Sequence, residues 1–441
     1  MNGQSPFSGW QLSGAPNLRG RGVIGYAPIR RQDNPVTRTS SNPCAMARAS
    51  APEVRLNLLL AHPRLPPERF ESARALVREI EDPDHFVSMA ARKFSLPTIS
   101  RYLGEIGFND RFPQAAAQSK RLVLFFVTHK LKQMAALRRF QEECVGAAGV
   151  DAIYFKGPTL DRFYGSSGAR FFRDIDLLVE EDAIAPLVNH ALERGYRVVL
   201  DAEHGVMASS EADIRAARRY LKEITLLSES GLSFEIHHRV DRHISLFDTA
   251  ELMKTACDAE IEGMHVRTFA DEAHFVYLCY HSCRHMWSHM HWVADLNAIV
   301  SHSSFDRDRC LREARTHGLE RCVEASLGLL DLCADPMRWD RIKVRGHAEI
   351  LLEACIENLQ GNHETEISLR KRGVGPGPDW RAPVGRELQF RLKEHLFQAS
   401  PKITQYTEWP LPEQLQWLYY FTRPIYAVRH KLKRRGETRQ E

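Results

Sequence analysis

The sequence predicts an α+β protein in which a small mixed β-sheet core is flanked by N-terminal and C-terminal helical regions. Three observations predict this class. Helical spacing of apolar residues dominates from about residue 54 to 148, strand-like runs fill 149–245, and helical spacing returns from about 246. We therefore expect a disordered tail over 1–50, a helical region over 51–148, the sheet-containing core over 149–245 and a second helical region over 246–441.

Length and composition are those of a soluble globular protein. The chain has 441 residues, enough for more than one ordinary domain, and is 43% hydrophobic and 26% charged. No run approaches the roughly 18 apolar residues of a membrane span. The net charge of +4 is a small excess of 60 basic over 56 acidic residues, so it does not demand nucleic acid as a partner.

The cysteines predict a reducing compartment. There are nine, an odd number, and they are widely spread, which fits cytoplasmic thiols better than a disulfide framework. Cys279 and Cys283 lie close to His281 and His285, a spacing that suggests zinc. On a helix, however, the two pairs would lie about 200° apart, so one ion could not easily collect all four side chains.

The first fifty residues are rich in Gly, Ser, Pro, Asn and Arg and contain a single acidic residue, Asp33. This composition predicts disorder. No apolar segment typical of a secretory signal is present. Two interpretations stay open: a transit peptide, or an upstream start codon assigned in place of Met46.

The first helical region is predicted by apolar stripes. Phe70, Ala73 and Val77 share a face after Pro66–Pro67, and a long helix is expected from about Ala115 to Cys144. Gly146 and Gly149 follow that helix, and glycine commonly ends helices.

The core begins with a strand at Ala152–Phe155 that leads into a turn at Lys156-Gly157. Arg173–Val179 alternates, which predicts a half-buried strand with Asp174, Asp176 and Leu178 on one face. A helix over residues 184–192 follows and ends at Gly195. Two further strands, Leu221–Leu227 and Leu232–Val240, are joined by a hairpin turn over residues 228–231.

The C-terminal region is predicted to be helical over Ala273–Val300, with room for a break, and over Cys310–Cys333 and His347–Leu359. Gly361–Arg381 is polar and rich in Gly and Pro, which predicts a loop. Arg429–Arg435 is a basic cluster, which we interpret as a solvated tail rather than a binding arm.

The chemistry is predicted by an ordered set of residues: Lys156-Gly157, Arg170, Asp174-Ile175-Asp176 and Glu235-Ile236-His237. Carboxylates at i and i+2 of a strand project from one face, about 6.5–7 Å apart. That spacing suits one shared Mg²⁺ or two neighbouring ions. If the two strands are neighbours in register, three carboxylates converge, and a divalent cation is their natural counter-charge.

Phosphoryl or nucleotidyl transfer is the reaction that this set favours. Mg²⁺ prefers carboxylates together with phosphate oxygens. Lys156-Gly157 at a strand-to-helix turn would let phosphate approach backbone N–H groups beside a cation. Asp-x-Asp alone is also typical of a solvated strand face, so the prediction depends on the ordered combination of motifs.

The segment YFKGPTLDRFYGSSGARFFRDIDLLV resembles the uncharacterised nucleotidyltransferase family found in bacterial polysaccharide and peptide-modification gene clusters. Further similar segments are FEIHHRV, YLCYHSCRHMWSHMHWVADLNAIV and LPEQLQWLYYFTRP, so the resemblance covers about Leu56 to Arg435. It implies the DNA polymerase β-like fold, with residues 149–245 as the nucleotidyltransferase core, and two-metal chemistry. Two departures stand out: the superfamily usually has Gly-Ser where Lys156-Gly157 stands, and commonly Asp where Glu235 stands.

The resemblance implies roles for seven residues. Asp174, Asp176 and Glu235 would ligate Mg²⁺, and Glu235 would also take the proton of the acceptor hydroxyl. The remaining members would bind the nucleotide, with Lys156 and Arg170 on its phosphates; this set is Lys156, Gly157, Arg170 and His237. The expected reaction moves NMP from an NTP, with ATP preferred, to a hydroxyl-bearing small molecule, sugar or peptide, with release of pyrophosphate.

Two alternatives remain: a non-catalytic scaffold of the same fold that binds nucleotide or a partner protein from a biosynthetic cluster, and a toxin-like enzyme that modifies tRNA. Weak net basicity counts against nucleic acid. His281, His285 and His289 could form a wall of the site, although packing against Trp287, Trp292 and Asp295 is favoured. An aromatic group near the C-terminus could stack a base but is more often core; its members are Trp409, Trp417, Tyr419 and Tyr420.

Overall fold

The computed structural model describes most of the chain from residue 51 onward. The undescribed residues are 1–50, 166–168, 203, 242–245, 337–338, 340–345, 362–364, 366–367, 370–384 and 438–441. The predicted tail over 1–50 and most of the predicted loop Gly361–Arg381 therefore lie outside the described residues.

A mixed eight-stranded sheet with the order β4-β3-β5-β6-β2-β1-β8-β7 forms the centre of the fold. Its strands are β1 (Ile153–Phe155), β2 (Asp174–Leu178), β3 (Arg197–Asp201), β4 (Val206–Met207), β5 (Glu223–Leu227), β6 (Ser233–His237), β7 (Cys257–Ile261) and β8 (Met264–Thr268). The pairs β2–β6 and β1–β8 are parallel and the other neighbours are antiparallel. This sheet with helical flanks confirms the predicted class.

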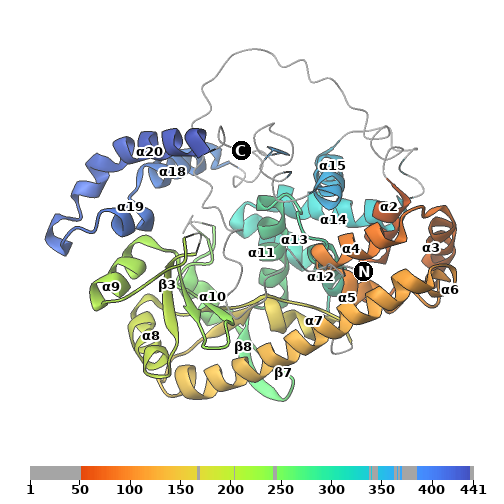
Figure 1. The fold of residues 1–441 in the computed structure, drawn as a ribbon, viewed down its shortest axis with the longest axis horizontal. Helices are drawn as coiled ribbons and strands as arrows, with labels where there is room; N and C mark the ends of the chain where they lie inside the picture. The colour runs from red at the N-terminus through yellow and green to blue at the C-terminus, as the bar shows by residue number, and fades with distance from the viewer. Residues whose placement is uncertain are drawn as a thin grey trace, which may run out of the picture.

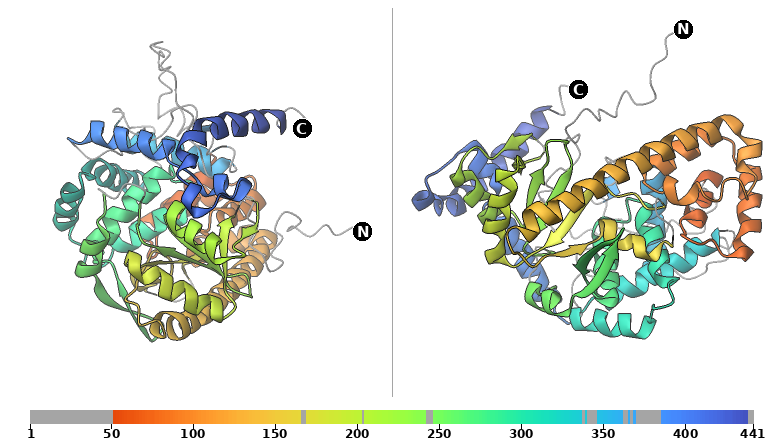
Figure 2. Two further views of the ribbon diagram at one scale, coloured as in Figure 1. Left: turned by 90° about the vertical axis from the view of Figure 1, so that its left-hand side faces the viewer. Right: turned by 90° about the horizontal axis from the view of Figure 1, so that it is seen from below.

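The N-terminal helices precede the sheet in sequence. They are α2 (Pro52–Leu60), α3 (Pro67–Glu79), α4 (Pro83–Arg92), α5 (Leu96–Ile99), α6 (Phe108–Arg111) and α7 (Pro113–Phe140). Helix α7 begins with a proline at its first position, where no backbone N–H is needed. It continues as one π-helical turn, Gln141–Gly146, and runs the length of the molecule from the N-terminal helices to the sheet (Figures 1 and 2).

Three helical segments lie between strands of the core. The turn after β1 continues as a 3-10 helix, Gly157–Phe163, and α8 (Ile184–Glu193) follows β2. Helix α9 (Glu211–Tyr220) begins with a capping box, in which the Ser210 hydroxyl accepts from the Asp213 N–H and the Asp213 carboxylate accepts from the Ser210 N–H.

The C-terminal helices pack in two places: most of those before residue 361 lie with the N-terminal helices, and those after residue 386 lie near α9 (Figure 1). They are α10 (Thr249–Thr255), α11 (Asp271–Arg284), α12 (His291–Val300), α13 (Arg307–His317), α14 (Glu320–Ala334), α15 (His347–Gln360), α18 (Glu387–Ala399), α19 (Ile403–Glu408) and α20 (Leu418–Glu437). The predicted break in Ala273–Val300 falls at Met286 and Trp287, which both adopt positive φ. Within the described residues, no helix is both long and apolar enough to cross a membrane.

The sheet separates two hydrophobic cores, because successive side chains of a strand point to opposite faces. Ile153, Phe155 and Leu178 join the core built by α2–α5 and α11–α15. Tyr154 and Leu177 join the other core, with the C-terminal end of α7, α8, α9 and α19. The first face also carries the charged side chains of the motifs, so the candidate site lies between the sheet and the larger helical layer.

The strands and helices of two segments differ from those predicted. Residues 246–441 were expected to be helical, but β7 and β8 form a hairpin that completes the sheet beside β1. In addition, β3, β4 and α9 were not predicted in the segment between Gly195 and Leu221. The predicted strands and the hairpin turn over 228–231 are confirmed, with slightly shorter strands.

Candidate active site

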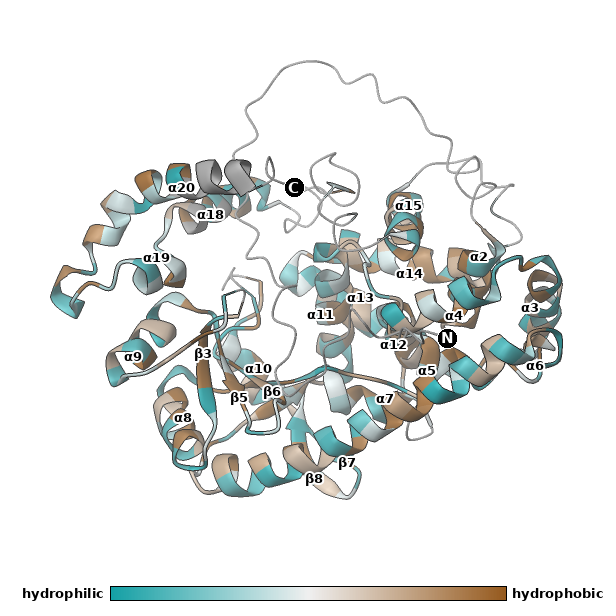
Figure 3. Ribbon diagram, viewed as in Figure 1, coloured by the Kyte–Doolittle hydropathy of each residue, from teal (hydrophilic) through white to brown (hydrophobic). Residues whose placement is uncertain are grey.

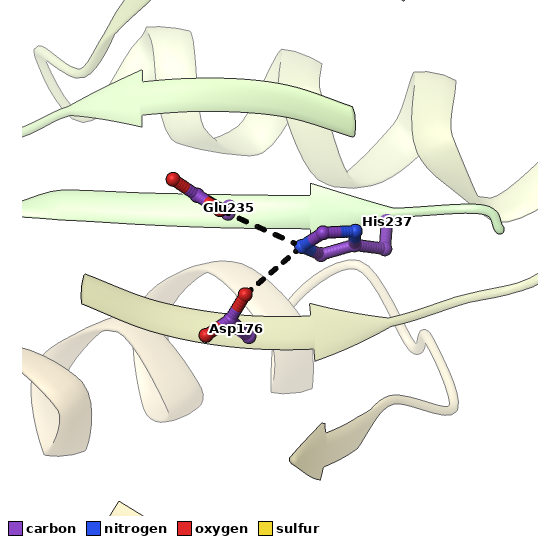
Figure 4. Close-up of side chains that lie close together, drawn as sticks. All are labelled: Asp176, Glu235 and His237. Carbon is purple, nitrogen blue, oxygen red and sulfur yellow. Dashed lines mark hydrogen bonds and ion pairs between the residues drawn. The ribbon is translucent and has the colours of Figure 1, made fainter. Parts of the chain in front are cut away.

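The acidic motifs meet where β2 and β6 pair in parallel. The register places Asp176 opposite Glu235 and Leu178 opposite His237, so the three polar side chains share one face. All three are buried, with exposed fractions of 2%, 4% and 1% for Asp176, Glu235 and His237. Figure 4 shows the three side chains converging from the two strands. The expectation that the two strands are neighbours in register is confirmed.

His237 lies between the two carboxylates. Its Nε2 atom is 3.0 Å from Oδ1 of Asp176 and 3.7 Å from Oε2 of Glu235, and its Nδ1 atom is 3.3 Å from Oε2 of Glu223. Burial lowers the pKa of His237, but hydrogen bonds to Asp176 and Glu235 raise it more, so the net shift is upward. Glu223 itself forms an ion pair with Lys222. The site is thus a buried network of acidic and basic side chains.

Lys156 supplies a cation to the same network. Its Nζ atom donates to Oδ1 of Asp176 at 2.7 Å. Burial lowers the pKa of this ammonium, but Asp176, Tyr277 and the other nearby acids raise it further, so it stays charged. The ammonium also lies 5.2 Å from the centre of the Phe155 ring. The predicted nearness of Lys156 to the acids is therefore a direct contact in the structure.

The turn after β1 holds Lys156 in an unusual backbone conformation. Its φ of 57° is positive, which is uncommon for a side chain other than glycine, and Gly157 follows with φ of 41°. A Cβ atom on Gly157 would lie 3.2 Å from the backbone oxygen of Asp174. Glycine is thus required for close packing against β2. Such strain is typical of functional sites.

The backbone of this turn is held by a buried histidine for which the sequence predicted no role, His274. The Lys156 N–H donates to Nε2 of His274 at 3.1 Å. Burial, followed by the nearby cations, lowers the pKa of His274 far below its ordinary value. The ring is therefore neutral, and because Nε2 accepts, its proton lies on Nδ1. His274 on α11 thus fixes the strained residue through its backbone.

Arg170 is bound by other residues of the chain. Its guanidinium is 4% exposed and forms a two-point ion pair with Asp295 on α12, at 2.6 and 2.9 Å. The remaining Nη1 donates to the backbone oxygen of Gly157 at 2.6 Å. Tyr164 donates to the same Asp295 carboxylate at 2.7 Å. All three guanidinium nitrogens are engaged within the protein, so Arg170 braces the turn, and its contact with a phosphate stays a prediction.

The group of possible metal ligands in the structure shares Asp176 and Glu235 with the predicted set of Asp174, Asp176 and Glu235. Among the described residues, the group whose ligand atoms lie within 4.8 Å of one another is Asp176, Glu235 and His237. Asp174 lies two positions earlier on the same face of β2, at the half-buried start of the strand. It is close enough to raise the pKa of Lys156. Asp174 therefore borders the group without being part of it.

The helical histidines lie beside this site. The rings of His281 and His285 are 4.7 Å apart, and each contacts Trp292 on α12. Burial, with the charge of Lys156 next, lowers the pKa of His281 well below its ordinary value. Cys279 and Cys283 belong instead to the apolar core. The cysteine and histidine pairs of α11 thus have different surroundings, as their helical spacing predicts.

Comparison with known proteins gives the geometry a family context. Residues 79–335, more than half of the sequence, match the model of an uncharacterised nucleotidyltransferase family. The chain belongs to this family. No curated protein matches it. The matched region spans the whole sheet and the helices α11 and α12 that brace the Lys156-Gly157 turn. Membership and the buried acidic group together support nucleotidyl transfer.

Proposed function

We propose that the protein transfers NMP from an NTP, with ATP preferred, to the hydroxyl group of a small molecule, sugar or peptide, with a divalent cation as cofactor. The observation that carries the proposal is the parallel pairing of β2 and β6, which sets the Asp176 and Glu235 carboxylates side by side at the Lys156 turn. Family membership supports the reaction type. The acceptor and the preference for ATP are parts of the proposal.

The residues fit a divalent cation. Carboxylate oxygens of Asp176 and Glu235 are ligands that Mg²⁺ prefers, and the imidazole of His237 completes a donor group of suitable spacing. Asp174 would extend the site along the same face of β2. A bound cation would neutralise the carboxylates and polarise the phosphates of the nucleotide. Mg²⁺ at this site, with a second ion beside it, is the cofactor that we propose.

The chain's own residues then have distinct tasks. The oxygen of the acceptor hydroxyl forms a bond to the α-phosphorus, the bond from that phosphorus to the oxygen bridging the α- and β-phosphates breaks, and pyrophosphate leaves with the electron pair. The Glu235 carboxylate accepts the hydroxyl proton. The Lys156 ammonium binds phosphate oxygens, and Gly157 lets the nucleotide approach the backbone. Arg170 acts by positioning this turn.

The test is NTP consumption and pyrophosphate release in Mg²⁺. Asp176→Asn and Glu235→Gln should each lower the rate by at least about 10²-fold, because each removes a carboxylate that would hold the proposed cation, and Glu235→Gln also removes the proposed base. Asp201→Asn is the matched control, since Asp201 is also a buried carboxylate on this sheet but contacts His204. Equal activity of wild type and Asp176→Asn would refute catalysis at this site. A mass gain of one nucleotide unit would identify the acceptor.

A second candidate, the non-catalytic scaffold, is favoured by one observation. Lys156 already neutralises Asp176 within the chain, so the fold does not need an ion to balance this carboxylate. Calorimetry separates the two functions: the enzyme should bind ATP more tightly with Mg²⁺, whereas a scaffold without a metal site should show no such dependence.

A further inference from the structure

The exposed apolar side chains of this protein are concentrated in its C-terminal helices. Among the described residues, nine of the eleven exposed large hydrophobic side chains lie between positions 388 and 428. They are Leu388, Leu392, Leu396, Leu415, Trp417, Tyr420, Phe421, Ile425 and Val428. Scattered exposed leucines are ordinary, but a concentration of this kind marks an interaction surface.

The exposed residues of α20 follow from how this helix packs. Tyr419 and Tyr426, one face of the helix, are only 1% and 3% exposed. Tyr419 donates to the backbone oxygen of Trp409, and Tyr426 donates to Glu408 at the end of α19. This face ties α20 to the rest of the molecule.

The opposite face of α20 carries the apolar stripe. Phe421, Ile425 and Val428 recur at i, i+4 and i+7 and are 70%, 67% and 60% exposed. Trp417 lies one turn earlier and packs edge-on against Phe421 at 5.8 Å. Helix α20 therefore has two apolar faces. One packs against the protein, and the other is exposed.

Helix α18 adds a second stripe. Leu388, Leu392 and Leu396 recur every four residues and are 81%, 58% and 62% exposed. Helices α18 and α20 contact each other. In Figure 1 they form the upper left corner of the molecule, with α19 between them and α9, and Figure 3 shows apolar segments along α20.

The sequence of α20 is basic towards its C-terminal end. Arg429 is exposed, and the sequence of α20 continues with four further basic residues and no acidic one before Glu437: Lys431, Lys433, Arg434 and Arg435. A helix that combines Trp, Tyr and Phe with a cluster of Lys and Arg is typical of segments that lie in the interface of a bilayer. Anionic lipid headgroups would attract the basic residues while the apolar stripe inserts.

We propose that α18 and α20 form a membrane-binding surface that docks the protein peripherally on a bilayer containing anionic lipids. The surface would hold the enzyme at the membrane without spanning it. The charge complementarity favours anionic lipid over a second copy of the chain, because two identical basic helices would repel each other. This inference does not depend on the proposed reaction.

The test is co-sedimentation of the full chain with phosphatidylcholine vesicles, with and without phosphatidylglycerol. Binding should require phosphatidylglycerol and weaken as salt is added, since salt screens the attraction. The double variant Phe421→Asp/Ile425→Asp should lose at least a factor of about ten in binding, because each buried side chain contributes that much to partitioning. Leu131→Asp is the control, since Leu131 is 60% exposed on α7, away from this surface.

Two results would overturn the proposal. The first is failure of the wild type to sediment with either vesicle. The second is a concentration-dependent dimer that the double variant abolishes, which would show that a second copy covers the surface. Leu392→Asp on α18 provides an independent variant, so that a folding defect of the double variant cannot decide the outcome.

Discussion

Lys156 and Gly157 are two consecutive residues with strained backbone conformations at the candidate site. Both have positive φ, and the second packs against the backbone of β2. The strain is maintained by contacts on both sides, with His274 on the Lys156 N–H and Arg170 on the Gly157 carbonyl. A strained turn that is braced in this way holds the Lys156 ammonium against Asp176 before any nucleotide binds.

Gly157→Ala should reduce activity and stability together. The new Cβ atom would lie 3.2 Å from the backbone oxygen of Asp174 and would resist the positive φ. We expect a loss of about 1–3 kcal/mol in the free energy of unfolding, measured with urea. Gly205→Ala is the matched control: its φ of 68° is also positive, but nothing lies within 4 Å of its Cβ position. Equal losses in both variants would show that the contact with β2 contributes nothing.

His62 should make stability depend on pH. Burial is the main cause that lowers its pKa from 6.5 to about 4, and its ring contacts Ser301 at the end of α12. Between these values the unfolded chain binds a proton that the folded chain refuses, so stability is complete above 6.5 and falls as the pH drops towards 4. The full effect is about 3 kcal/mol at most.

The measurement compares the free energy of unfolding at about pH 7 and about pH 5 in wild type and His62→Gln. The variant should show a smaller decrease, since other buried histidines remain. His395→Gln, at an exposed position of α18, should leave the wild-type decrease unchanged. If His62→Gln showed the same decrease as the wild type, His62 would not be the source of the pH dependence.

At the scale of residues, the positions that could be predicted lie on strands in which polar and apolar residues alternate. Asp176, Glu235 and His237 could be placed on one face because a strand repeats every two residues. The ion pair of Arg170 could not be predicted, because its partner Asp295 lies 125 positions away on a helix. His274 was missed since a buried histidine on an apolar helix carries no local signal of its contact.

At the scale of elements, α12 is tied to the turn after β1 through the Arg170–Asp295 pair. Asp295→Asn should lower the free energy of unfolding by about 3–5 kcal/mol, because it leaves a buried guanidinium with a neutral partner. Urea unfolding checks this value. Glu211→Gln is the control, since the exposed pair between Glu211 and Arg215 should contribute less than about 1 kcal/mol. A similar small loss in Asp295→Asn would show that the pair does not brace the turn.

The helices and strands that were not predicted differ in how clearly their sequences indicate secondary structure. The β7–β8 hairpin has a two-residue turn at Glu262-Gly263, and both residues adopt positive φ, as this turn type demands. The alternation of polar and apolar residues on both sides of this turn also indicates a hairpin. Strand β4, with two residues, is too short for any periodicity to show. Helix α9 carries a capping box of Ser210 and Asp213, which is a recognisable start signal.

At the scale of the whole molecule, the sheet is assembled from distant parts of the sequence. Strand β1 pairs with β2 on one side and with β8, more than a hundred residues later, on the other. The predicted boundary at residue 245 therefore cuts a continuous sheet. No local pattern could reveal this, because the pairing partner of a strand is set by tertiary packing.

A fragment of residues 51–245 should aggregate more readily than one of residues 51–269. The longer fragment adds only α10 and the hairpin, so both lack the same C-terminal helices. In the shorter fragment the edge of β1 is open, and unpaired strand edges join other chains. Thioflavin fluorescence and light scattering measure the difference. Equal aggregation would show that the hairpin does not protect the sheet.

The late position of β8 also bears on synthesis. A chain leaving the ribosome presents β1, β2, β5 and β6, with all the acidic residues of the site, before the strand that covers β1 has been made. Until Thr268 has emerged, the nascent sheet has an open side. The chain must therefore pass through a stage at which chaperones have a strand edge to protect.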